Sequence, residues 1–213
     1  MVHNEHMKKR RFWVIALSSL VVSAGLSTSA ALGEGRTSSL VPEASMLIDD
    51  FSDPGRMSAL GTFWRGFTDQ VMGGVSTASS KIETIDGRPA LRLSGDVSLK
   101  NNGGFIQVAL PLTGSGAPLD VSAYRGIRLR VRGNGETYHL HLRTTTTALP
   151  WQYYHAAFPA LAKWATVELL FEDFEPAAMR AKLDPSRLTR LAVVASKKEF
   201  RADIAVAKIE FFK

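Results

Sequence analysis

The sequence of 213 residues contains no cysteine. This absence excludes disulfide bonds, a cysteine-ligated zinc site, an iron–sulfur cluster and a thiol nucleophile. An excess of one charge is also largely missing. The net charge is +6, but without the first eleven residues the chain has 22 Lys and Arg against 19 Asp and Glu, a net charge of +3. Because no block of like charge remains, we predict no nucleic-acid partner.

Long hydrophobic runs are scarce as well. The longest runs from Phe12 to Leu26, follows the basic segment Met7 to Arg11 and precedes small residues at 27–31. This pattern is typical of a secretory signal, and about 15 residues is short of the roughly 20 that span a bilayer. We predict a signal peptide over 1–31 and an exported protein, periplasmic or extracellular. The alternatives are an uncleaved leader that tethers the protein to the membrane, and a twin-arginine signal.

Residues 32–45 form an aperiodic linker, and residues 46–213 form one domain. Within the domain, apolar and polar residues alternate in short runs separated by turn residues, which predicts an all-β sandwich or barrel with one short helix near 176–182. No repeated βαβ pattern occurs, so dinucleotide-binding folds are not expected. The predicted strands cover 46–51, 80–85, 90–94, 104–110, 126–132, 137–143, 152–158, 165–171, 188–195 and 204–212.

The clearest local pattern covers 127–143, where two alternating runs flank the turn residues 133–135. We predict a hairpin with one apolar face and one accessible, electropositive face. The charge on that face is offset by acids on neighbouring strands, by solvent or by an anionic ligand. The residues of the polar face are Arg128, Arg130, Arg132, His139, His141 and Arg143.

A specific string occupies 63–76, FWRGFTDQVMGGVS, and later segments at 101–105, 124–133 and 138–174 match in order. Together they resemble the complex I intermediate-associated protein family, whose founding member is a mitochondrial assembly factor for respiratory NADH dehydrogenase. The resemblance implies a galactose-binding-like jelly-roll β-sandwich. It also implies a non-enzymatic module that holds or delivers protein partners, such as respiratory-complex subunits. The secretory leader departs from the mitochondrial pattern and puts assembly on the matrix or cytoplasmic side in doubt.

The matching segments give the first candidate site, for a protein partner. Paired glycines allow close backbone approach, and tryptophan with methionine offers an adaptable apolar contact. The structural alternative places Trp64 and Met72 in the core and gives the glycines and asparagines to turns. The candidate residues are Trp64, Asp69, Gln70, Met72, Gly73, Gly74, Ser76, Asn101, Asn102, Gly103 and Gly104.

A second candidate site would bind carbohydrate. Aromatic rings stack on the apolar side of a pyranose while polar neighbours bond its hydroxyls. Trp151, Tyr153 and His155 share one face of a predicted strand, opposite Tyr154 and Phe158. Packing of these rings under a loop is the structural alternative. The candidate residues are Arg128, Arg130, His139, His141, Arg143, Trp151, Tyr153 and His155.

We predict no metal and no cofactor. The pair His139 and His141 has a usable ligand spacing, but the neighbouring arginines would repel a dication. The acids Asp49, Asp50 and Asp53 are assigned to turns rather than to calcium. No hydrolase motif occurs, so an enzyme remains only a third reading without identifiable residues. The domain is therefore expected to be a binding or assembly module.

Overall fold

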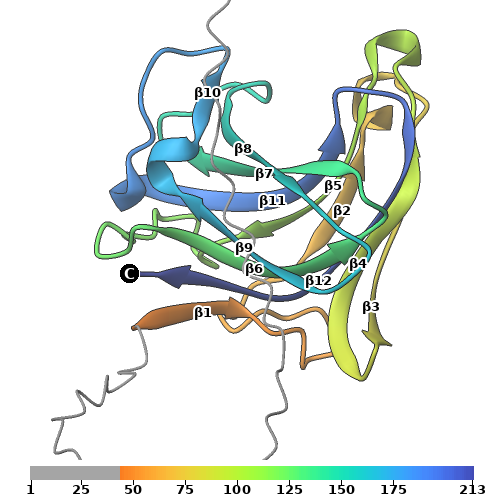
Figure 1. The fold of residues 1–213 in the computed structure, drawn as a ribbon. Coiled ribbons are helices and arrows are strands. Elements are labelled where there is room, and N and C mark those ends of the chain that lie inside the picture. Colours follow the sequence, from red (N-terminus) through yellow and green to blue (C-terminus); the bar gives the residue numbers. More distant parts are fainter. Residues whose placement is uncertain (1–43) are drawn as a thin grey trace, which may run out of the picture.

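The computed structural model describes residues 44–213, which form two six-stranded antiparallel sheets packed face to face (Figure 1). The first sheet has the order β3-β4-β12-β6-β9, with β1 also paired to β12, and the second has the order β10-β8-β7-β11-β5-β2. This architecture confirms the all-β sandwich. The strands are β1 (Ser45–Asp49), β2 (Arg65–Thr68), β3 (Thr77–Ile85), β4 (Arg88–Val97), β5 (Phe105–Pro111), β6 (Gly126–Gly133), β7 (Thr137–Thr144), β8 (Tyr153–Pro159), β9 (Ala165–Leu170), β10 (Glu175–Ala177), β11 (Leu188–Ser196) and β12 (Phe200–Phe212).

Helical structure within the described residues is limited to four short 3-10 turns, η1 (Asp69–Met72), η2 (Lys100–Asn102), η3 (Phe171–Asp173) and η4 (Pro185–Arg187). The helix predicted at 176–182 is wrong. Pro176 instead lies in the edge strand β10, opposite Tyr154, where a missing N–H donor is tolerated. No helix among residues 44–213 is both long and apolar enough to cross a membrane.

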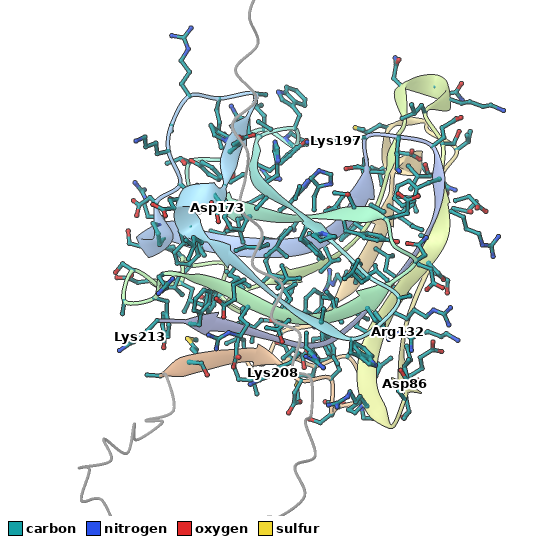
Figure 2. All side chains as sticks on the ribbon, in the orientation of Figure 1. Asp86, Arg132, Asp173, Lys197, Lys208 and Lys213 are labelled. Carbon is teal, nitrogen blue, oxygen red and sulfur yellow. The ribbon has the colours of Figure 1, made fainter. Side chains whose placement is uncertain are left out.

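The core lies between the two sheets and is built by the alternation seen in the sequence. On β6 the side chains of Ile127, Leu129 and Val131 are fully buried, and on β7 those of Leu140 and Leu142 are fully buried. Because successive side chains of a strand point to opposite faces, each strand buries one set and turns the other outward. Candidate sites are therefore sought among the side chains on the outer faces of the two sheets and on the loops at the ends of the sandwich (Figure 2).

The predicted hairpin is wrong. β6 pairs with β12 and β9 in the first sheet, whereas β7 pairs with β11 and β8 in the second. The turn at 134–136 carries the chain from one sheet to the other, so the apolar sets of β6 and β7 face each other across the core. Arg128 and Arg130 consequently lie on one outer face of the sandwich, and His139 and His141 lie on the opposite one. Alternation predicts which side chains are buried but not which strands pair.

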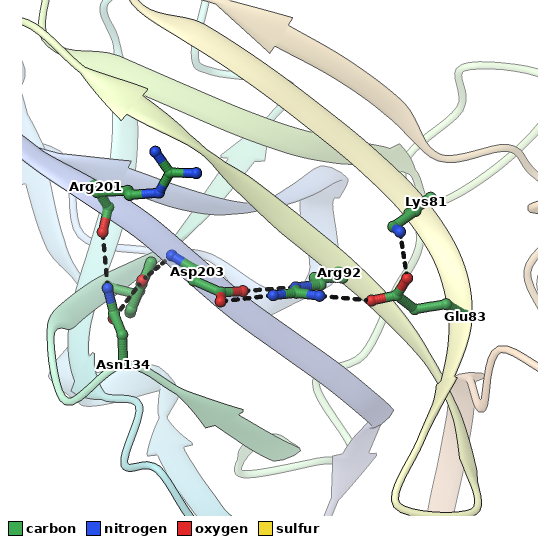
Figure 3. Close-up of polar contacts among 7 residues, drawn as sticks. Lys81, Glu83, Arg92, Asn134, Arg201 and Asp203 are labelled. Atoms are coloured by element: carbon green, nitrogen blue, oxygen red, sulfur yellow. Dashed lines mark hydrogen bonds and ion pairs between the residues drawn. The ribbon is translucent and has the colours of Figure 1, made fainter.

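Charged side chains on the first sheet are joined across strands (Figure 3). The guanidinium of Arg92 makes two bonds of 2.7 Å to the carboxylate of Asp203 and one of 3.0 Å to Glu83. Tyr138 donates to Asn134, and the backbone N–H of Asp203 donates to the Tyr138 hydroxyl, both at 2.8 Å. These contacts tie β3, β4 and β12 to the turn that connects the sheets.

Candidate functional site

Two short segments far apart in the sequence, 69–76 and 98–104, lie together at one end of the sandwich, at the upper right in Figure 1. We call them the loop tip. Asp69, which is fully buried, joins them. Its carboxylate accepts hydrogen bonds from the backbone N–H of Ser76 (2.9 Å), the Ser76 hydroxyl (2.5 Å), and the backbone N–H groups of Gly104 (2.6 Å) and Phe105 (3.4 Å). The family-like string thus encodes a buried anion that binds four donors.

The electrostatics of Asp69 follow from these bonds. Burial alone would raise the pKa of its carboxyl group, but the hydrogen bonds from Ser76, Gly104 and Phe105 outweigh burial and lower that pKa. The carboxylate is therefore ionised at neutral pH and holds the loop tip together. It has no free face for a ligand.

The glycines of the loop tip are needed for two reasons, a left-handed backbone conformation and close approach to the Asp69 carboxylate. Gly73 ends η1 with a φ of +89°, a backbone conformation that favours glycine. At Gly74 and Gly103 an added Cβ would overlap the Asp69 side chain. Gly74 and Gly103 therefore leave room for the protein's own carboxylate.

Three of the residues predicted to contact a partner are in fact buried. Trp64 is 2% exposed, and its indole N–H donates to the Asp49 carboxylate at 2.6 Å. Asp69 and Ser76 are fully buried. The prediction of direct contact is therefore wrong for these three. Their string has the composition of an exposed loop, but Trp64 packs in the core, and Asp69 and Ser76 hold the loop together by a buried hydrogen bond.

The loop tip exposes large apolar side chains beside the polar Gln70, Lys100, Asn101 and Asn102. Val71 is 73% exposed and Met72 is 60% exposed, with Val75 and Leu99 also exposed. Met72 was among the predicted residues, whereas the other three were missed. A signal for them exists in the sequence, since large apolar residues placed between turn-forming glycines and polar residues do not fit a buried strand.

The remaining predicted residues of the tip shape its backbone. The side-chain amide of Gln70 donates to the carbonyl of Ser76 (2.9 Å), and that of Asn101 donates to the carbonyl of Gly73 (3.3 Å). Asn101 and Asn102 both have a φ of 57°, in the left-handed region that asparagine tolerates. The alternative of a turn role for the asparagines is thus the one that the structure shows.

A second candidate surface lies on the outer face of the second sheet. We call it the ring cluster: His139 and His141 on β7, and Tyr153 and His155 on β8. Tyr153 stacks on His141 with ring centroids 4.1 Å apart and an angle of 11° between planes. The three imidazole centroids are 5.9 to 6.2 Å apart. The next strands of the sheet, β11, β5 and β2, continue this face with an apolar cluster. Its residues are Ala192 and Val194 on β11, Ala109 and Phe105 on β5, and Phe67 on β2.

The imidazoles of β7 are uncharged at neutral pH. Burial, with smaller contributions from Lys197 and His155, lowers the pKa of His139 to about 4. Burial and the neighbouring histidines lower the pKa of His141 to about 3. The Nδ1 atom of His139 and the Nε2 atom of His141 are buried without a hydrogen-bond partner. Within 44–213, no group of three or more His, Asp or Glu side chains has a geometry that would hold a metal ion.

Arg143 supports the loop that leads into the ring cluster. Its guanidinium donates to the carbonyls of Thr147 (2.6 Å) and Leu149 (3.0 Å) and so fixes the segment before β8. Trp151, at the end of that segment, is 59% exposed. Arg128 and Arg130 lie on the other sheet, so the predicted carbohydrate face is corrected to the residues of β7, β8 and this loop.

The three acids near the domain entry serve turns, as predicted. Asp49 accepts from the backbone N–H of Phe51, Asp50 from that of Ser52, and Asp53 from that of Gly55.

Solved structures with a similar fold include carbohydrate-binding modules. The family 11 carbohydrate-binding module of the cellulosomal cellulase Lic26A-Cel5E of Clostridium thermocellum superposes with a TM-score of 0.63 at 13% identity, covering 80% of this chain and 95% of that one. The family 11 module from Clostridium thermocellum in complex with a β-1,3-1,4-mixed-linked tetrasaccharide has a TM-score of 0.62 at 14% identity, covering 79% and 95%. At these identities the likeness shows the galactose-binding-like jelly-roll fold.

No curated protein sequence matches the chain. A family profile does match, that of complex I intermediate-associated protein 30 (CIA30), over residues 50–203. The matched region contains both segments of the loop tip and most strands of the sandwich. The chain therefore belongs to the complex I intermediate-associated protein 30 family.

Proposed function

We propose that this domain is a non-catalytic binding module that docks a protein partner through the loop tip. The observation that carries the proposal is the exposure of Val71 and Met72 on a backbone that Asp69 holds rigid. Family membership supports it, because the family is named for association with an assembly intermediate of a respiratory complex. Respiratory-complex subunits are therefore the first partners to test.

The physical case rests on preorganisation. Apolar side chains at 73% and 60% exposure leave no polar group unsolvated when they are buried, and their burial contributes roughly 25 cal/mol for each Å² removed from water. A loop that is already ordered avoids the entropic cost of ordering on binding. Four hydrogen bonds to one carboxylate supply that order at the loop tip.

The test is a pair of substitutions at the exposed residues, Val71→Ser with Met72→Ser. We expect the double variant to keep the melting temperature of the wild type and to lose crosslinking to its partner in cells. Leu161→Ser is the matched control, because Leu161 is also an exposed apolar residue, at 42%, outside the tip. Equal capture by the wild type and the double variant would contradict docking at the loop tip.

A second candidate function is carbohydrate binding at the ring cluster. It is favoured by one observation, the stacked and partly exposed pair of Tyr153 and His141 on the outer face of the second sheet. An exposed ring face can stack on the apolar side of a pyranose. The carbohydrate-binding modules of the same fold support this candidate.

A glycan panel tests this candidate. It would include a β-1,3-1,4-mixed-linked glucan, and binding would be read by affinity electrophoresis. Tyr153→Ala should abolish retardation, whereas Phe63→Ala, which removes an exposed aromatic residue elsewhere, should not. Absence of retardation across the panel would eliminate the candidate and leave protein docking.

We also propose that the domain acts outside the cytoplasm. The support is the leader pattern of residues 1–31, which lies outside the described residues. Fractionation of cells that express the full chain with a carboxy-terminal tag tests the location, and recovery of the unprocessed chain in the cytoplasm would contradict it.

A further inference from the structure

The outer face of the first sheet, opposite to the ring cluster, contains a hollow of about 440 Å³. Strands β4, β6, β9 and β12 and the segment after β1 line it. Its charged lining comprises four cations and two carboxylates: Arg88, Arg128, Arg130, Lys208, Asp50 and Glu210. The hollow therefore has more cations than carboxylates in its lining.

Strand register decides which of these cations is offset. Arg128 lies between Glu168 on β9 and Glu210 on β12, at 2.7 and 3.5 Å. Its guanidinium also lies over the ring of Phe212, 4.6 Å from the centroid. Arg128 is thus fixed by acids on both sides, the first of the offsets expected from the sequence.

Arg130, two residues along the same strand, has different neighbours. Its register partners are Thr166 on β9 and Lys208 on β12, so a hydroxyl and a second cation replace the two acids. Like charges directly opposite each other on neighbouring strands are destabilising. Lys208 forms an ion pair with Glu210 at 2.7 Å and also interacts electrostatically with the Asp50 carboxylate, although Glu210 is shared with Arg128. Arg130 has no such acid beside it in the register. The Arg88 side chain has no ion pair or hydrogen bond to the described residues and adds to the positive charge of the hollow.

Arg130 and its neighbour Thr166 supply hydrogen-bond donors to the hollow. The Nη1 atom of Arg130 donates to the Thr166 hydroxyl at 3.1 Å, so that oxygen accepts and its own hydrogen is free to donate into the hollow. The carboxylate of Asp50, the other acid of the lining, accepts from the backbone N–H of Ser52 at 3.1 Å. A guanidinium, an ammonium and a hydroxyl are the donors that a tetrahedral oxyanion needs.

We propose that this hollow is a binding site for a phosphate oxyanion, held by Arg130, Lys208 and Thr166. The bound anion offsets the like-charge pair of Arg130 and Lys208. A hollow of 440 Å³ has room for more than an isolated phosphate, so the same chemistry accommodates a phosphate ester. Free phosphate and the phosphate of a lipid headgroup are the two sources that the test must separate.

The test uses the full chain and follows amide chemical shifts during titration with inorganic phosphate at constant ionic strength. We expect saturable shifts confined to β6, β9 and β12, and a dissociation constant at least tenfold weaker in Arg130→Gln. Arg201→Gln is the matched control, because this residue is on β12 of the same sheet, 85% exposed and outside the hollow. It should bind phosphate as the wild type does.

A second arm uses sedimentation with vesicles of phosphatidylglycerol or phosphatidylcholine. Cosedimentation with phosphatidylglycerol that Arg130→Gln abolishes assigns the site to a lipid headgroup, and phosphate binding without cosedimentation assigns it to a small anion. Thr166→Val, checked by thermal melting, replaces Arg130→Gln where that variant does not fold. No saturable phosphate binding, or equal weakening by Arg201→Gln, would overturn the proposal. Neither result bears on docking at the loop tip.

Discussion

Replacing the buried carboxylate of Asp69 by an amide, Asp69→Asn, should destabilise the domain strongly. The change keeps the size of the side chain but turns one acceptor oxygen into a donor group. One oxygen of Asp69 accepts from the backbone N–H of Ser76, and the other accepts from the Ser76 hydroxyl, Gly104 and Phe105. In either orientation of the amide, at least one buried donor faces another donor.

The size of the effect follows from those contacts. A hydrogen bond to a charged group contributes roughly 1.5 to 3 kcal/mol, and a buried donor left without an acceptor costs about 1 to 3 kcal/mol. The free energy of unfolding should therefore fall by about 3 kcal/mol or more. For a domain of this size that corresponds to a melting temperature lower by about 6 to 12 °C.

The pH dependence of the stability loss distinguishes loss of the carboxylate from a general packing defect, which would not depend on pH. The folded pKa of Asp69 is lowered below its ordinary value of 3.8. The stabilisation is therefore fully present above pH 3.8 and is lost as the pH falls through the folded pKa. In urea unfolding, the difference in the free energy of unfolding between the wild type and Asp69→Asn should be constant between pH 5 and 7 and should become smaller below pH 3.8.

Asp96→Asn is the matched control, because the Asp96 side chain is 64% exposed and lies 3.9 Å from Arg201. It should change the free energy of unfolding by less than about 0.5 kcal/mol. The reasoning is refuted if Asp69→Asn is as stable as this control, or if its gap to the wild type does not narrow in acid.

Three further changes test other parts of the fold. Gly74→Ala should cost about 1 to 3 kcal/mol in denaturant unfolding, because its Cβ overlaps the Asp69 side chain, and a neutral result would contradict that close approach. Tyr138→Phe should cost about 1 to 2 kcal/mol, since the backbone N–H of Asp203 loses its acceptor, and wild-type protection of that amide in hydrogen exchange would count against it. The pKa of His139 is about 4 in the folded domain and 6.5 ordinarily, so the unfolded chain binds the proton at a higher pH than the folded domain does. The free energy of unfolding should therefore fall, by up to about 3 kcal/mol, as the pH drops from 6.5 to 4. Urea unfolding should show a shallower pH slope in His139→Leu, and an unchanged slope would show that this imidazole is not desolvated.

The sequence predicted the fold class and ten of the strands because alternation reports directly which side chains are buried. It missed β2 and β10, which are only four and three residues long, too short for a period of two to stand out. It paired β6 with β7 because a turn rich in glycine joins them. Pairing depends on which strands share a sheet, and no local pattern carries that information.

The candidate site was predicted by position but not by the role of each side chain. The string that carries the family resemblance does mark the loop tip. Asp69, however, acts on Gly104, a residue 35 positions away, and only the folded chain brings the two together. The exposed residues Val71 and Leu99 were missed, because apolar side chains are expected inside and their exposure is decided by the turn that carries them.

Docking at the loop tip is tested most directly by site-specific photo-crosslinking in cells that express the full chain. A photoreactive residue would replace Val71, Tyr153 or Leu161 in turn, to report on the loop tip, the ring cluster and an exposed apolar control. We predict a discrete protein adduct from position 71 and none from position 161. Adducts only from position 153, or none from position 71 while the domain remains folded, would contradict protein docking at the loop tip.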